Sequence, residues 1–190
     1  MSTSLPERTY HHGDLRAALV SAALDLLESG GAAALSLRAA ARACGVSAMA
    51  PYRHFASKED LLEAVAARGF EQLAADLEAA DAAADGKAAL AAQGAAYVAF
   101  ACRHPALFRL MFTRPCRVSD QGRAYRILAR RAAALAGPAR PAEDLTLAAW
   151  SLVHGLAALI LDRRVPLEGA DAEAAARRIT LSFARLMPDG

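Results

Sequence analysis

The chain has 190 residues, of which 55% are hydrophobic and 22% are charged, and its formal net charge is +2. This length corresponds to one or two domains, and the apolar fraction is too high for a disordered chain. The apolar run from Leu156 to Leu161 is much shorter than the roughly 18 residues of a membrane span. No secretion signal is expected, because residues 1–13 are polar, and three cysteines without metal-site spacing favour reduced thiols. We therefore expect a globular, cytoplasmic protein with no membrane span.

Composition also predicts the fold class. Alanine, the strongest helix former, is the most frequent residue, and aromatic residues make up only 6% of the chain. No segment alternates apolar and polar residues between turn signals, as a half-buried strand would. The sequence therefore predicts an all-α fold.

Helix-capping residues divide the first part of the chain into four expected helices. Asp14 is expected to open the first helix, which Gly30-Gly31 end. Ser36 is expected to cap a short helix over Leu37–Cys44 that Gly45 closes, and Ser47 another that runs to about Phe55. The sequence from Ser57 to Asp60 has the form of a capping box before a long helix that ends near Ala84.

Prolines separate the later elements, because a proline interrupts a helix interior. Five further helices are expected, which brings the total to nine: Lys87–Arg103, Pro105–Thr113, Ser119–Ala136, Ala142–Arg164 and Asp171–Met187.

The segment from Leu37 to Phe55 carries the clearest indication of function. Two short helices flank a three-residue turn, Gly45-Val46-Ser47, which is the pattern of a helix-turn-helix. An α-helix fits the major groove of DNA, and its first residues reach base edges there. The alternative is an ordinary helical turn inside a core. The excess positive charge lies wholly in residues 1–58 and weakly favours DNA.

Residues 13–65 resemble the N-terminal DNA-binding domain of TetR-type transcriptional repressors. The matching motifs are Leu15-Arg16-Ala17-Ala18-Leu19, Leu37-Arg38-Ala39-Ala40-Ala41, Gly45-Val46-Ser47, Tyr52-Arg53-His54-Phe55 and Ser57-Lys58-Glu59-Asp60-Leu61-Leu62. A shorter stretch is similar to the ligand domain of one branch of that family, through His104-Pro105-Ala106-Leu107-Phe108 and Trp150-Ser151-Leu152-Val153-His154-Gly155. The resemblance implies an arm and DNA-binding domain over residues 1–58 and an effector-binding and dimerisation domain over residues 59–190.

The resemblance also assigns candidate DNA contacts. Tyr52 stands where family members have a phosphate-contacting tyrosine, and Lys58 matches a lysine at the start of the long helix. Many members carry a hydroxyl residue and Leu where this chain has Ala50-Pro51. Because Pro51 lacks an N–H, we expect the recognition helix to start late. The full set of candidate contacts is Arg38, Ser47, Ala48, Met49, Tyr52, Arg53 and Lys58.

By the same resemblance, the last two helices pair with those of a second copy to form a homodimer. A dimer suits a helix-turn-helix protein, because two half-sites together raise affinity and specificity. The alternative is that these apolar residues are the core of a monomer. The candidate interface residues are Leu152, Leu156, Leu159, Ile179, Phe183 and Leu186.

Large apolar side chains set among many alanines can leave a cavity, and ligand sites are mostly apolar. The resemblance implies that a small-molecule effector binds in this part of the chain and releases the DNA. The polar candidates are His154, Cys102, His104 and Tyr125, and the alternative for each is a hydrogen-bonded core or surface group. The candidate pocket residues are Tyr97, Phe100, Phe108, Met111, Phe112, Trp150 and His154.

Residues 103–140 hold nine arginines and one acid, Asp120. We interpret them as a solvated face, and an anionic effector or acidic partner is the alternative. No phosphate-binding loop, nucleophile elbow or His-Glu-x-x-His pair is present, so no enzyme activity, cofactor or metal site is predicted. The predicted function is a transcriptional regulator with double-stranded operator DNA and a small molecule as partners. The alternative is a helical carrier or interaction protein without DNA binding.

Overall fold

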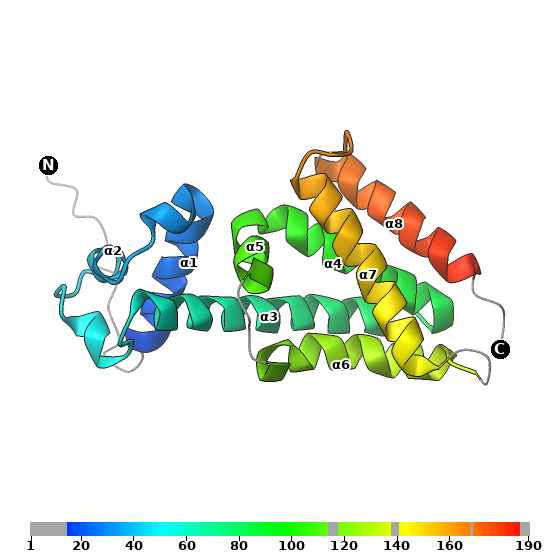
Figure 1. The fold of residues 1–190 in the computed structure, drawn as a ribbon, viewed down its shortest axis with the longest axis horizontal. Coiled ribbons are helices and arrows are strands. Elements are labelled where there is room, and N and C mark those ends of the chain that lie inside the picture. The colour runs from blue at the N-terminus through cyan, green and yellow to red at the C-terminus, as the bar shows by residue number, and fades with distance from the viewer. Residues whose placement is uncertain (1–14, 114–117, 138–140, 168, 187–190) are drawn as a thin grey trace, which may run out of the picture. The chain divides into compact units, whose positions relative to one another are not determined.

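The computed structural model describes residues 15–113, 118–137, 141–167 and 169–186. The expected N-cap Asp14 and the expected last helical residue Met187 lie outside these ranges. Within them the protein is helical, which confirms the all-α prediction (Figure 1). Eight α-helices and one 3-10 helix (η1) form the described regular structure: α1 Leu15–Ala34, α2 Leu37–Ala43, η1 Ala50–Arg53, α3 Lys58–Ala82, α4 Gly86–Arg103, α5 Pro105–Thr113, α6 Val118–Leu135, α7 Ala142–Leu161 and α8 Gly169–Leu186.

The chain forms two compact units, residues 1–62 and residues 63–190. Helix α3 begins in the first unit and continues into the second. The boundary expected from the sequence, after residue 58, falls at the first residue of this helix. Each unit has its own buried apolar residues, as a domain requires.

The first unit packs α1, α2 and η1 around a small core. Leu19, Leu35, Phe55 and Leu61 are almost completely buried in it. Helix α1 is broken at Gly31, whose φ of 68° is unfavourable for residues with a Cβ, as the paired glycines predicted.

The second unit is built around α4, which packs against α5, α6, α7 and α8 (Figure 1). The approach to α8 is close at Gly94, where a Cβ would lie 2.6 Å from Cγ2 of Thr180. The hydroxyl of Thr180 donates a hydrogen bond to the carbonyl of Ala91 across the same interface, over 3.0 Å. A glycine and a buried hydroxyl therefore fix how α4 and α8 meet.

Arginines of α6 pair with acids of α3. Arg123 donates to Glu71 over 2.8 Å and to Glu78 over 2.5 Å. Arg130 and Arg131 both donate to Asp81, over 3.2 and 2.7 Å. The arginine-rich stretch is therefore more than a solvated face, because its charges hold two helices together.

Helices α1 and α7 are each long and apolar enough to cross a membrane, by length and composition alone. This corrects the expectation drawn from the short run at Leu156–Leu161, since no charged residue stands between Asp144 and Asp162. In the structure, apolar residues of both helices are buried inside the protein, including Leu19 on α1 and Val153 on α7. Core helices of soluble proteins pass the same criterion.

Candidate DNA-binding surface and effector cavity

The first helix of the predicted helix-turn-helix forms as expected. The side-chain oxygen of Ser36 accepts a hydrogen bond from the N–H of Ala39 over 3.1 Å and so caps α2. At the other end, the N–H of Val46 donates to the carbonyl of Ala41 over 3.0 Å, and Gly45 adopts a φ of 69°. This is a Schellman motif, which turns the chain sharply after α2.

The second element is not the α-helix predicted to begin at Ser47. It is the 3-10 helix η1, preceded by a turn in which the N–H of Ala50 donates to the carbonyl of Ser47 over 3.0 Å. Pro51 has no N–H to donate to the preceding turn, which favours the tighter pattern. Its ring is completely buried. The late start expected at Ala50-Pro51 is therefore confirmed, while the helix type and length were wrong.

Most of the predicted DNA contacts lie on the surface of this unit. Met49 is 70% exposed and Tyr52 is 45% exposed, so both side chains are accessible to a partner. The remaining members of the set that are exposed are Arg38, Ser47, Ala48 and Arg53.

Lys58 differs from the others because it is half-buried. Its Nζ donates a hydrogen bond to the carbonyl of Ala32 over 2.9 Å. Next to it, the N–H of Asp60 donates to Oγ of Ser57 over 3.1 Å, and Oδ2 of Asp60 accepts from the N–H of Ser57 over 3.2 Å. This confirms the predicted capping box, which fixes the start of α3 and with it the position of Lys58.

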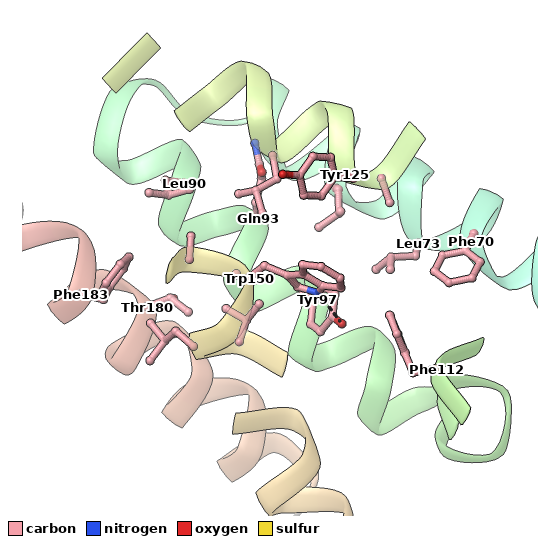
Figure 2. Close-up of a pocket in the computed structure, with 17 residues that line it drawn as sticks. Phe70, Leu73, Leu90, Gln93, Tyr97, Phe112, Tyr125, Trp150, Thr180 and Phe183 are labelled. Atoms are coloured by element: carbon pink, nitrogen blue, oxygen red, sulfur yellow. Dashed lines mark hydrogen bonds between the residues drawn. The ribbon is translucent and has the colours of Figure 1, made fainter. Parts of the chain in front are cut away.

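A cavity lies inside the second unit (Figure 2). Its volume is about 60 Å³, several times the roughly 10–15 Å³ that a cavity needs to hold one water. A compact organic molecule is therefore the appropriate occupant. The lining residues are mainly apolar, and none is charged: Phe70, Leu73, Leu77, Leu90, Gln93, Gly94, Tyr97, Phe112, Ala124, Tyr125, Leu128, Ala149, Trp150, Leu152, Val153, Thr180 and Phe183.

Three of the predicted pocket residues, Tyr97, Phe112 and Trp150, line this cavity. The other four do not. Phe100, Phe108 and Met111 are buried in the packing of α4 and α5, where neighbouring side chains cover them. His154 is outside the lining and contacts the hydroxyl of Tyr97. The lining residues of α3, such as Phe70, were not predicted, because apolar periodicity does not show which helix faces a cavity.

Tyr97 connects two other side chains. Its hydroxyl lies 2.8 Å from Nδ1 of His154 and 3.3 Å from Nε1 of Trp150. The indole N–H can only donate, so the phenol oxygen accepts from Trp150. The tautomer of His154 decides which side donates in its contact with the phenol. Burial raises the pKa of Tyr97 and lowers the pKa of His154, which keeps both side chains neutral.

Gln93 is the most buried polar residue of the lining, with 2% exposure. Its Nε2 donates to Oδ1 of Asp81 over 2.6 Å. Asp81 also accepts hydrogen bonds from Arg130 and Arg131. The hydrogen bond from Arg131 is the main reason that the pKa of this carboxyl lies below its usual value. The amide oxygen of Gln93 is buried, and no donor among the described residues reaches it.

The outer sides of α7 and α8 expose several large apolar side chains. Three of the predicted interface residues are among them, Leu159 at 46%, Ile179 at 37% and Leu186 at 84%. Leu156 is buried within its own chain, and Leu152 and Phe183 line the cavity. Leu147, which was not predicted, is 58% exposed.

The two parts of the chain match two related family models. The model of the tetR family of bacterial regulatory proteins matches residues 19–65, and the model of the tetracyclin repressor-like C-terminal domain matches residues 90–183. Together they cover most of the chain. No curated protein matches the sequence.

Solved structures agree with this assignment. A protein of unknown function from Rhodococcus sp. RHA1 is 34% identical, with 95% of this chain and 99% of that chain covered and a TM-score of 0.79. A bacterial regulatory protein in the tetR family from Rhodococcus RHA1 is 22% identical, with 93% and 98% covered and a TM-score of 0.66. The TetR family transcriptional regulator PfmR from Thermus thermophilus is 24% identical, with 88% and 97% covered and a TM-score of 0.62. The last two show the shared fold. From the two family models and the helix-turn-helix, the chain belongs to the TetR family of DNA-binding transcriptional regulators.

Proposed function

We propose that this protein is a cytoplasmic, homodimeric repressor that binds a pseudo-palindromic operator and is released from it by a small molecule in the cavity of the second unit. The observation that carries the DNA-binding part is the exposure of Met49 and Tyr52 on and beside η1. An apolar side chain suits a thymine methyl group, and a phenol suits a phosphate oxygen. Arg38 and Arg53 add positive charge on the same unit.

The DNA-binding part is tested by selecting bound sequences from a random double-stranded DNA library. We expect a pseudo-palindrome, because a two-fold dimer presents two equal recognition elements. Arg38→Ala should weaken binding of the selected duplex by about tenfold, as loss of one base or phosphate contact does. Arg164→Ala is the control, since Arg164 is an exposed arginine of the second unit. Failure to enrich any sequence would favour the carrier or interaction protein.

Effector binding is supported by a cavity whose lining is apolar and free of charged residues. Ala149 lines it, so Ala149→Leu fills part of the space. In a screen of small aromatic compounds for release of the selected duplex, we expect active compounds with the unchanged protein and none with Ala149→Leu. The variant should still bind DNA in the absence of a compound. Release of equal strength from both proteins would place the effector elsewhere.

The homodimer is supported by the exposed apolar side chains of α7 and α8. Leu147, Ser151, Gly155 and Leu159 recur every four residues on α7 and are all exposed, so they form one outward stripe. Leu159→Glu should convert a dimer to a monomer in analytical ultracentrifugation, because a buried unpaired charge is costly. Ala88→Glu is the control, at an exposed position on α4. A dimer that survives Leu159→Glu would exclude this face.

A further inference from the structure

The amide of Gln93 has a fixed orientation. Its two ends differ, since Nε2 can only donate hydrogen bonds and Oε1 can only accept them. Oδ1 of Asp81, an acceptor, lies 2.6 Å from Nε2. Exchanging the two ends would place two acceptor oxygens against each other, so Asp81 holds Nε2 towards itself and turns Oε1 away.

Asp81 is itself held in place by charge. Arg131 donates to Oδ1 over 2.7 Å and Arg130 donates to Oδ2 over 3.2 Å. The carboxylate is therefore ionised and cannot turn to supply a donor to Gln93. Asp81, Arg130 and Arg131 together fix the orientation of the Gln93 amide, so the amide does not rotate freely.

The other buried polar side chains of the cavity wall, Tyr97 and Thr180, have hydrogen-bond partners, and Tyr125 is exposed. The phenol of Tyr97 accepts from Trp150 and shares a hydrogen bond with Nδ1 of His154. The hydroxyl of Thr180 donates to backbone carbonyls, among them that of Ala91. Within the described lining, Oε1 of Gln93 is the buried polar side-chain atom for which no donor is found. A buried acceptor without a donor destabilises the empty cavity, and a ligand that supplies a donor removes this cost.

We propose that the cavity selects a compact, uncharged, mainly aromatic or apolar molecule that carries one N–H or O–H donor directed at Oε1 of Gln93. This inference rests on the proposed function, since it describes the ligand of the same cavity. The lack of charge follows from the lining, where a charged ligand would be buried without a counter-charge. The aromatic character follows from Phe70, Phe112 and Trp150, which supply flat apolar surface.

The test compares two probes of nearly equal shape, indole, which has an N–H donor, and 1-benzofuran, which has an oxygen in its place. Isothermal titration calorimetry measures both affinities with the unchanged protein. Indole should bind about tenfold more tightly than 1-benzofuran, because only indole satisfies the buried acceptor. Equal affinities, or no binding of either probe up to its solubility limit, would overturn the proposal without requiring any variant.

Gln93→Leu removes the acceptor at nearly constant volume. In this variant we expect the preference for indole to disappear, while 1-benzofuran binds as well as before or better. Gln72→Leu is the matched control, because Oε1 of Gln72 is also buried without a partner but Gln72 does not line the cavity. It should keep the tenfold preference. A preference that persists in Gln93→Leu would assign the donor contact to another residue and overturn the proposal.

The two levels of proposal can fail separately. If indole binds with the expected dependence on Gln93 but does not release operator DNA, the ligand inference holds and release by this cavity fails. If indole releases DNA equally well from the unchanged protein and from Gln93→Leu, effector release holds and the role of Gln93 is wrong.

Discussion

The hydroxyl of Tyr97 on α4 and Nδ1 of His154 on α7 lie 2.8 Å apart, so a hydrogen bond joins the two helices. Trp150 donates its indole N–H to the same phenol oxygen over 3.3 Å. His154 is half-buried, and this burial disfavours its charged form. It is surrounded by aromatic rings, with the ring centre of Phe112 4.7 Å away.

The first prediction concerns the pH dependence of folding. Burial lowers the pKa of His154 below its usual value of about 6.5, so the unfolded chain takes up this proton more readily than the folded one. The free energy of unfolding is therefore unaffected by His154 above about pH 6.5. It decreases as the pH falls below that value, because the unfolded chain then binds the extra proton. His154→Asn keeps a polar group that can form a hydrogen bond with the Tyr97 hydroxyl, but the asparagine side chain does not titrate. Urea unfolding at fixed protein concentration should show a shallower loss of stability between about pH 6.5 and pH 5 in this variant. An unchanged slope would mean that His154 titrates normally.

The second prediction concerns the buried carboxylate between α3 and α6. Asp81→Asn removes the charge that Arg130 and Arg131 share, and should lower the free energy of unfolding by about 2 kcal/mol at neutral pH. Because folding lowers the pKa of Asp81, the difference in free energy of unfolding between the unchanged protein and Asp81→Asn should disappear only as the pH falls below about 4. The control is Asp76→Asn, whose partner Arg103 is half-exposed, and it should cost less than about 1 kcal/mol. Equal losses in the two variants would contradict a special role for Asp81.

The third prediction concerns the close approach of α4 and α8. A Cβ on Gly94 would lie 2.6 Å from Cγ2 of Thr180 and 3.0 Å from Cγ1 of Val153. Gly94→Ala should therefore destabilise the protein by about 1–3 kcal/mol, in spite of the higher helix propensity of alanine. Gly122→Ala provides the comparison, because its Cβ would meet only the end of the flexible Arg126 side chain. Thermal unfolding should show a lower midpoint for the first variant and an equal or higher one for the second.

The fourth prediction separates two roles of Lys58. An ammonium group has three donors, and one of them is directed to the carbonyl of Ala32. A phosphate contact can use another. If Lys58 contacts one phosphate, Lys58→Met should reduce the slope of log affinity against log salt by about 0.9. Arg164→Ala should leave the slope unchanged. A weaker affinity of Lys58→Met with the full slope would show that Lys58 acts only by positioning the start of α3.

Local signals in the sequence predicted the local structure well. Gly31, Gly45, Ser36 and Ser57 each break, turn or cap a helix as expected, because these effects depend on neighbours within about four residues. Pro51 shows the limit of such reasoning. The missing N–H correctly predicted a late helix start, but the burial of its ring and the 3-10 form depend on the packing of the whole unit.

The cavity could be predicted only in part. Aromatic side chains of α4, α5 and α7 suggested it, and Tyr97, Phe112 and Trp150 do line it. The contact between Gln93 and Asp81 joins residues on different helices, and no periodicity in the sequence pairs them. The same holds for Arg123, whose two acceptors lie on α3. Such contacts follow from how helices are arranged, which composition and capping do not specify.

Trp150 is the one tryptophan of the sequence, and it both lines the cavity and donates its indole N–H to Tyr97. The tryptophan emission of the whole protein therefore originates beside the proposed ligand. A non-emitting compound that enters the cavity should shift or quench this signal in a titration, without any label or engineered probe. The intrinsic fluorescence of Trp150 thus reports directly on ligand binding in the cavity.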